Sequence, residues 1–176
     1  MTANFLIHLS GLVALALTVG GLLGSSDRAL RTSTGVASAI WALNNLLIGA
    51  HTAAVLSALT VGRQASAEAM QARSSRTRFA AFAAIEALTL AASTLTWNGW
   101  ASLLTCAGSL IGTWAMFYLR AVALRLAMVL VAALWMYNAW AYNSWWQMVA
   151  VSASGAAALL GAWRARALPL APRGVC

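Results

Sequence analysis

Two tryptophan–asparagine pairs are the residues of this sequence that could recognise a ligand. Trp41 precedes Asn44 by three residues, and Trp135 and Asn138 repeat the pair 94 residues later. Residues three apart share a helix face, and lipid offers an amide no hydrogen-bond partner. The four residues are therefore predicted to line a substrate-binding cavity for a small polar, ring-bearing solute. The alternative is that the amides bond neighbouring helices and the indoles fill space between them.

The repetition extends beyond the two pairs without a gap. A basic residue, Arg31 in one half and Arg125 in the other, stands at the same distance before each tryptophan. Such a repeat predicts an internal duplication, with a binding site where the two copies meet. The remaining matches at the same offset are Leu30 with Leu124 and Ile40 with Leu134.

Glu86 is the one acidic residue placed well inside an apolar segment. Placing a charge there costs roughly 2.5 to 3.5 kcal/mol on insertion scales, so the carboxyl needs a partner or a proton. One interpretation is a proton-coupling or cation-binding group. The other is a protonated or hydrogen-bonded carboxyl that attaches its helix to a neighbour, and the sequence leaves both open.

Other polar residues have simpler explanations. His8 and His51 could respond to pH, but interfacial polarity accounts for them and their spacing is not that of a metal site. Ser57, Ser152 and Ser154 lie beside small residues, which favours close helix packing, with pore lining as the alternative.

No enzyme motif is present, and the whole chain holds three carboxylates, so we predict that it is not an enzyme and uses no cofactor or metal. A membrane enzyme acting on a lipid headgroup would require His8, His51 and Glu86 to converge. Cys106 lies in an apolar run and Cys176 is the last residue, so neither a disulfide nor a metal-ligand spacing can be drawn.

The composition predicts a membrane protein. Hydrophobic residues make up 62% of the chain and charged residues 8%, with a positive mean hydropathy, which leaves too little polar surface for a soluble globule. The pI is near 11.4, but all 11 basic residues are arginines that stand singly or in small groups between apolar runs. That distribution indicates topology rather than nucleic-acid binding. The expected partner is the lipid bilayer.

Seven apolar segments are long enough to be transmembrane helices, because a hydrocarbon core about 30 Å thick needs roughly 20 helical residues. The third is short and carries Arg63, whose side chain is expected to reach outward to the headgroups. Pro169 and Pro172 make it unfavourable for the last helix to continue into the tail, which is expected to be mobile. The expected helices span residues 4–24, 32–49, 52–67, 79–96, 99–118, 122–142 and 144–163, with a loop at 66–78.

The arginines lie in or close to the loops that follow the first, third, fifth and seventh helices, and the loops after the second, fourth and sixth helices have none. This bias predicts a periplasmic amino terminus and a cytoplasmic carboxyl terminus. Two parallel three-helix repeats need an odd linker helix between them. We therefore expect an all-α membrane protein in a 3+1+3 parallel-repeat arrangement: a first triple-helix bundle at 1–70, a cytoplasmic loop and linker helix at 71–97, a second bundle at 98–164 and a cytoplasmic tail at 165–176.

Five short strings carry a resemblance to a known family: DRALR at 27–31, IWALNNLLIGA at 40–50, TWNGW at 96–100, LIGTW at 110–114 and LWMYN at 134–138. Over residues 5–165 the chain resembles the YgjV-type bacterial inner membrane proteins. That family is thought to be distantly similar to the SWEET and PQ-loop transporters, whose two triple-helix bundles are joined by a linker helix. The Pro-Gln pair of those transporters is missing from both halves, so the resemblance does not imply a proline-hinged mechanism.

These observations predict a multi-pass protein of the bacterial inner membrane that transports or binds a small polar solute at the interface of two helical repeats. Trp41, Asn44, Trp135 and Asn138 are the predicted substrate-binding residues, with Glu86 for proton or cation coupling. The alternative is a non-transporting accessory protein that binds a partner helix or lipid, which would have a closed interior. The sequence does not determine the oligomeric state, and a homo-oligomer is one alternative.

Overall fold

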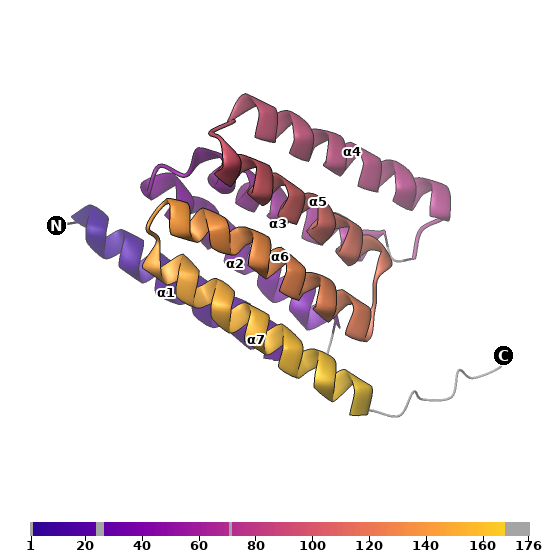
Figure 1. Ribbon diagram of the computed structural model, residues 1–176. Coiled ribbons are helices and arrows are strands. Elements are labelled where there is room, and N and C mark those ends of the chain that lie inside the picture. The colour runs from indigo at the N-terminus through magenta and orange to yellow at the C-terminus, as the bar shows by residue number, and fades with distance from the viewer. Residues whose placement is uncertain (1, 24–26, 71, 168–176) are drawn as a thin grey trace.

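The computed structural model describes residues 2–23, 27–70 and 72–167, and every regular element within these ranges is an α-helix (Figure 1). The helices contain 19 to 23 residues each, which corresponds to about 28 to 35 Å, close to the thickness of a bilayer's hydrocarbon core. In chain order they are α1 (Thr2–Leu23), α2 (Asp27–Leu47), α3 (His51–Ala69), α4 (Ser75–Leu95), α5 (Trp100–Tyr118), α6 (Ala121–Ala141) and α7 (Trp145–Ala167).

Four of the described helices, α1, α4, α5 and α6, are both long and apolar enough to cross a membrane. The polar side chains of α2 and α3 reduce the hydropathy of those two helices. Asn44 and Asn45 on α2, and Arg63 and Gln64 on α3, are all buried. The interior of the bundle is thus more polar than the largely apolar composition of the chain would indicate.

The helix ends differ from the expected ones where arginines stand near a terminus. α2 begins at Asp27 and α4 at Ser75, earlier than expected, because arginine is a good helix former. Ser74 caps α4, since its hydroxyl accepts a hydrogen bond from the Thr77 N–H at 3.2 Å. The loop expected at 66–78 is therefore mostly helical. Of the expected tail, residues 165–167 belong to α7, and 168–176 lie outside the described residues.

Six helices form two layers joined at both edges. Helices α1, α2 and α3 pack side by side in that order, and so do α5, α6 and α7. At one edge α1 contacts α7, and at the other α3 contacts α5. Helix α4 lies outside this second edge against α3 and α5, at the border of the molecule in Figure 1. The middle helices, α2 and α6, are left facing one another across the bundle.

Specific contacts close the two edges. At the α3–α5 edge, the Thr52 hydroxyl donates to the Thr96 carbonyl and lies 2.9 Å from the Ser102 hydroxyl. At the α1–α7 edge, a Cβ added to Gly11 would lie 2.7 Å from Cβ of Trp146, so glycine permits the close approach of the two helices. The Trp146 indole N–H also donates to Nδ1 of His8.

Small residues fill the interior, and large apolar ones face outward. Most of the buried apolar residues are alanines, whereas Phe5, Leu12, Phe79 and Leu95 are at least half exposed. Small interfacial residues let helix backbones approach closely in lipid, and an apolar exterior of this extent would be unfavourable in water. This inside-out distribution is that of a membrane protein.

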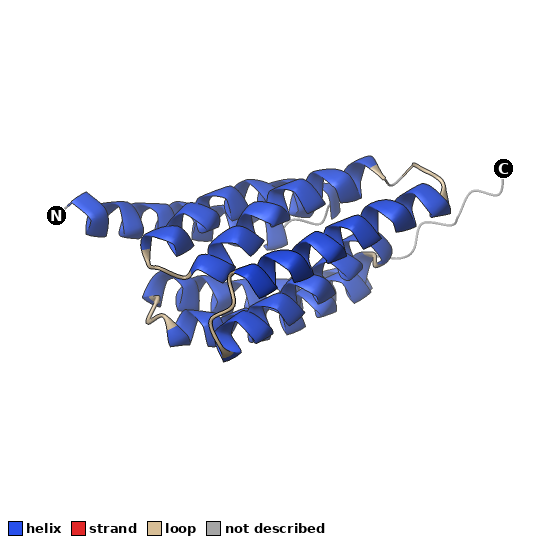
Figure 2. Cartoon of the chain, turned by 90° about the horizontal axis from the view of Figure 1, so that it is seen from above, coloured by secondary structure: helices blue, strands red, loops and turns tan. Residues whose placement is uncertain are grey.

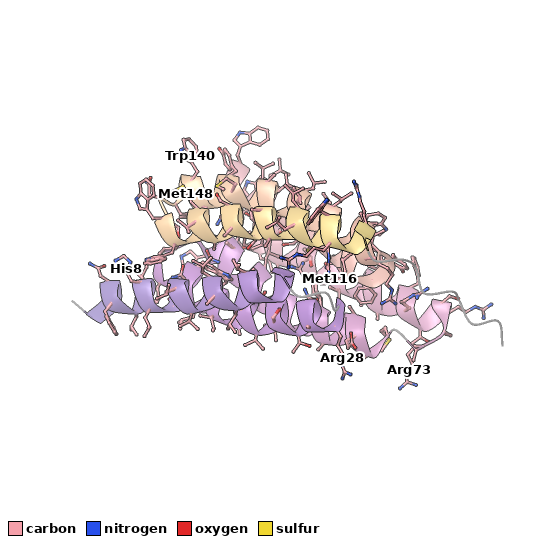
Figure 3. All side chains as sticks on the ribbon, turned by 90° about the horizontal axis from the view of Figure 1, so that it is seen from below. His8, Arg28, Arg73, Met116, Trp140 and Met148 are labelled. Carbon is pink, nitrogen blue, oxygen red and sulfur yellow. The ribbon has the colours of Figure 1, made fainter. Side chains whose placement is uncertain are left out.

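The two ends of the bundle differ in charge. The start of α1 and the turns after α2, α4 and α6 gather at one end, and the end of α7 lies at the other (Figures 1 and 2). In Figure 3, His8 and Trp140 lie toward the first end, and Arg28 and Arg73 toward the second. Four tryptophans near the first end are more than half exposed, as expected of an interfacial belt: Trp97, Trp100, Trp140 and Trp145.

The turns after α2 and α6 have the same backbone structure. Gly49 has φ +77° in the first turn, and Asn143 has φ +49° at the equivalent position of the second. Four backbone hydrogen bonds recur with every donor and acceptor moved by 94 residues. They are Ile48 to Asn44 and Tyr142 to Asn138, Gly49 to Leu46 and Asn143 to Trp140, Ala50 to Asn45 and Ser144 to Ala139, and Ala54 to Ala50 and Met148 to Ser144.

Candidate functional site

A cavity of about 150 Å³ lies between the two layers. Each of the six helices of the two layers contributes lining residues, and the outer helix α4 contributes none among the described residues. An engineered cavity of about this volume holds one benzene ring. The space is therefore suited to a ligand with the bulk of a single ring and a few further atoms.

The wall formed by α1, α2 and α3 is polar. Several of its hydroxyls are already bonded within their own helices: Thr18 donates to the Ala14 carbonyl at 2.8 Å, and Ser38 to the Thr34 carbonyl at 2.7 Å. The wall therefore offers few free donors, although it is rich in oxygen atoms. Its polar lining residues are Thr18, Thr34, Ser38, Ser57, Thr60, Arg63 and Gln64.

The wall formed by α5, α6 and α7 is largely apolar. Among its described lining residues, Gln147 and Ser154 alone have polar side chains besides the indole N–H of Trp135. The apolar surface comes from Met116, Met128, Val131, Ala132, Ala150 and Val151, with Gly112. The cavity is thus amphipathic, with hydrogen-bonding groups on one side and hydrocarbon on the other.

The lining positions of the two layers correspond in sequence. Trp41 and Trp135 both line the cavity, from α2 and α6. Five further pairs of lining residues are also 94 positions apart: Thr18 and Gly112, Thr34 and Met128, Ser38 and Ala132, Ser57 and Val151, and Thr60 and Ser154. In the first four pairs only one member has a hydroxyl, and in the fifth both do. The layers thus present residues 94 positions apart, mostly with unlike side chains, to the same space.

The two predicted asparagines lie behind the cavity wall rather than in it. Both are almost completely buried. The Asn44 amide donates to the Ile7 carbonyl at 2.8 Å and to the Ser10 hydroxyl at 3.0 Å, which joins α2 to α1. The Asn138 amide donates to Oε1 of Gln147 at 3.3 Å, which joins α6 to α7. Because Gln147 lines the cavity, Asn138 orients a lining side chain.

Arg63 points into the protein and not toward the headgroups, so the expectation that it reaches outward is wrong. Its side chain is 7% exposed. One terminal nitrogen donates to the Ser109 carbonyl at 2.9 Å and to the Thr113 hydroxyl at 3.2 Å on α5, and the other donates to Thr60. These oxygens replace the water that a headgroup position would have offered, so the guanidinium joins the two layers.

Two buried polar atoms, on side chains that line the cavity, have no hydrogen-bond partner within the described residues. They are Nε of Arg63 and Oε1 of the adjacent Gln64. Both side chains line the cavity, and both are more than nine-tenths buried. Both atoms lie beneath the surface of the cavity, and a buried polar atom without a partner is unfavourable.

Glu86 lies outside the cavity. It lines a groove between α4 and α5 together with Phe82, Leu110, Ile111 and Trp114. Neither carboxylate oxygen has a hydrogen-bond partner among the described residues, and the carboxylate attracts the guanidinium of Arg63 electrostatically. Glu86 can therefore influence the cavity through Arg63 without touching a ligand there.

The remaining predicted residues do not form a second site. His8 and His51 are exposed, and His8 bonds to Trp146. No group of three or more His, Cys, Asp or Glu residues within the described ranges could hold a metal ion. Ser57 and Ser154 line the cavity, which is the less favoured of the two interpretations of these serines, and Ser152 is exposed.

Sequence reasoning missed the most polar part of the site, Arg63 and Gln64. A usable signal was present, because an arginine and a glutamine adjoin one another within an otherwise apolar segment. Arg63 was predicted to reach the headgroups only because its helix was expected to be short and to end close to that residue. Gln147 was missed because it directly follows two tryptophans that mark the membrane interface.

Comparison with known proteins identifies the family. Neither the curated proteins nor the solved structures include a match, so the distant similarity to SWEET and PQ-loop transporters stays a prediction. The family described as Imp-YgjV, bacterial inner membrane protein, matches residues 5–168. Its description agrees with the apolar exterior and with the four described helices that are long and apolar enough to span a membrane, and it places the protein in the bacterial inner membrane. Because the match covers nearly the whole chain, the protein belongs to the Imp-YgjV family of bacterial inner membrane proteins.

Proposed function

We propose that this protein is a small-solute carrier or binding protein whose site is the cavity between the two layers. All seven helices cross the membrane, the amino terminus is periplasmic and the carboxyl terminus is cytoplasmic. Helices α1 to α3 and α5 to α7 are two copies of one ancestral unit, inserted in the same sense and joined by α4. The solute binds between the copies.

One observation supports this proposal above the others: the cavity is lined by residues at equivalent positions of both layers. A site at the interface of two repeats is the arrangement by which membrane transporters expose a solute alternately to either side. The repeated backbone pattern at Gly49 and Asn143 supports the duplication independently, because turn geometry and cavity lining are unrelated features. A closed interior, as an accessory protein would have, fits these observations less well.

The distribution of charge supports the orientation. In positive-inside topology the arginine-rich end faces the cytoplasm, and Arg28 and Arg73 lie toward the end of the bundle where α7 finishes. Helices α2, α3 and α7 fall short of the hydropathy of the other four, but several of their polar residues, Asn44, Gln64 and Gln147 among them, are buried inside the bundle rather than facing lipid. The bundle as a whole is therefore compatible with seven spans.

The four predicted substrate-binding residues have two roles in this proposal. Trp41 and Trp135 contact the solute, and Asn44 and Asn138 position the lining helices from behind. Glu86 acts in proton or cation coupling by competing with the solute for the charge of Arg63. The support for this is its carboxylate, which lies in a groove outside the cavity, has no hydrogen-bond partner among the described residues and attracts Arg63 electrostatically.

Single-cysteine labelling tests whether the cavity opens to water. In a background with Cys106 and Cys176 replaced by alanine, Ser38→Cys and Ser154→Cys each place one thiol at the cavity. Ser152→Cys is the matched control, because it lies two residues from Ser154 on α7 and is exposed on the outer surface. The thiols are treated with a membrane-impermeant methanethiosulfonate reagent in right-side-out and inside-out vesicles.

A carrier predicts labelling of both cavity thiols from both sides of the membrane, with the Ser152→Cys control unlabelled because lipid covers it. Labelling from one side alone would be compatible with a solute-binding protein and would exclude a transporter. Protection of both cavity thiols from both sides, in protein that denaturant renders fully reactive, would overturn the proposal in favour of the accessory protein.

A further inference from the structure

The charge inside the cavity restricts which solutes can occupy it. Arg63 is the one charged side chain among the described lining residues. Its terminal nitrogens are occupied by oxygens of Thr60, Ser109 and Thr113. A cation in the cavity would be repelled by this guanidinium, whereas an anion would be attracted by it, and a low-dielectric interior strengthens the charge interaction.

Glu86 does not fill the position that an anion would take. It attracts Arg63 from the groove between α4 and α5, and it is not among the residues that line the cavity. Its charge moderates the field of Arg63 from outside the cavity.

The opposite wall restricts the rest of the ligand. Met116, Met128, Val131 and Val151 offer no hydrogen bonds. A sugar carries hydroxyls around its whole ring and would leave several of them unpaired against this wall, which is costly. A flat hydrocarbon body would instead be buried favourably there.

The tryptophans favour a ring in particular. Trp41 and Trp135 line the cavity from the two middle helices, and indoles pack well against other aromatic groups in offset or edge-on geometry. The cavity's volume of about 150 Å³ limits the body to about one six-membered ring.

We propose that the solute is a small organic anion, a carboxylate on a single flat apolar ring, with its carboxylate at Arg63 and its ring against the α5–α7 wall. This inference rests on the proposed function, because it names the solute class of the same cavity.

Equilibrium binding of radiolabelled benzoate to the purified protein in detergent tests this proposal. Benzamide has the same shape without the charge, benzylamine carries the opposite charge, and glucose represents a polyhydroxylated ring. Benzoate is expected to bind, benzamide to compete at least tenfold more weakly, and benzylamine and glucose not to compete. Equal competition by benzoate and benzamide, or stronger competition by benzylamine or glucose, would overturn the assignment.

Two variants test the charge of Arg63 and the volume of the cavity separately. Arg63→Gln is expected to weaken benzoate binding at least tenfold and to leave benzamide binding unchanged, which abolishes the preference. Because Arg63 joins α3 to α5 and its loss could prevent folding, Ala132→Leu provides a second test: it fills the cavity from the apolar wall and leaves the contacts of Arg63 intact. This variant should lose both ligands, and Ser152→Ala should lose neither.

The outcomes distinguish this inference from the function on which it rests. Benzoate binding that survives Ala132→Leu would place the ligand elsewhere and overturn the assignment. If the cavity thiols are labelled from both sides but none of the four probes binds, the anion proposal fails and the carrier proposal stands. If the thiols are not labelled, the carrier proposal itself fails.

Discussion

Arg63 combines two functions that are usually separate in a membrane protein. It joins the two layers through the Ser109 carbonyl and the Thr113 hydroxyl on α5, and it brings a charge to the cavity. A buried charge is tolerated only where hydrogen bonds and an opposite charge compensate it. Here the compensation comes partly from Glu86 on the outer helix. The electrostatic potential in the cavity therefore depends on a residue that does not line it.

Replacing Glu86 with glutamine should strengthen anion binding. The substitution removes the negative charge that competes for Arg63 and keeps the shape of the side chain, so the guanidinium attracts a carboxylate ligand more strongly. We expect the dissociation constant of benzoate at pH 8 to fall several-fold, while that of benzamide is unchanged. Thr94→Ala, an exposed position on the same helix, is the control.

An unchanged benzoate constant in Glu86→Gln would show that the carboxyl is already protonated in the resting protein. Glu86 would then serve to attach α4 to the bundle, which is the other interpretation that the sequence left open. Proton-dependent uptake that persisted in full in this variant would exclude the coupling role.

The candidate site could be predicted in part from residue types. The tryptophans were identified because a repeated aromatic residue in an apolar helix is visible in the sequence, and Trp41 and Trp135 line the cavity. The direction of a side chain such as Asn44 is not visible there: a shift of one position on a helix turns a residue by about 100°. Whether an amide reaches a cavity or a neighbouring helix depends on how the helices pack.

At the scale of the elements, the turns after α2 and α6 share one pattern of backbone hydrogen bonds. Both reverse the chain within a few residues, and both need a residue with positive φ, which Gly49 and Asn143 supply. Glycine and asparagine are the two residues that adopt this conformation most readily. The same backbone requirement is thus met by two different residues.

Gly49→Ala should destabilise the protein, because alanine is disfavoured at φ +77° by about 1 kcal/mol. A Cβ at this position would meet no atom within 4 Å, so the loss comes from backbone conformation and not from crowding. Asn143→Gly is the matched substitution in the second turn and should leave stability nearly unchanged. Unfolding by a denaturing detergent, followed by circular dichroism, measures both.

An equal loss of stability in the two variants would contradict this account of the turns. The equivalence of the two turns would also be refuted if Asn143→Gly alone were destabilising. The Asn143 side chain would then have a role that Gly49 cannot share.

The number and order of the helices could be predicted from apolar runs alone, and the ends could not. The start of α4 shows why. Residues 75–78 read as a polar loop because they contain two arginines, yet arginine is compatible with a helix and Ser74 provides the cap. Polarity near a membrane surface marks where the lipid ends, and a helix can continue beyond that point.

For the molecule as a whole, orientation in the membrane follows from the difference between the two ends. Fusions of alkaline phosphatase, which is active only in the periplasm, should be active after residues 50 and 143 and inactive after residues 73 and 167. Fusions to green fluorescent protein at the same sites should give the reverse pattern. Activity after residue 73 would place the arginine-rich end outside and overturn the proposed orientation.

The polar wall also affects how the chain is inserted into the membrane during synthesis. Most of the side chains that give the cavity its hydrogen-bonding face, Arg63 and Gln64 among them, belong to α2 and α3, which lie outside the four most lipid-compatible helices. A single arginine near the centre of a helix opposes its transfer from the translocon by about 2.5 kcal/mol or more. Helices α2 and α3 are joined by residues 48–50 alone, so we expect them to leave the translocon as a hairpin that shelters its polar face against α1. The wall that recognises a solute would then be assembled before the second half of the chain is synthesised.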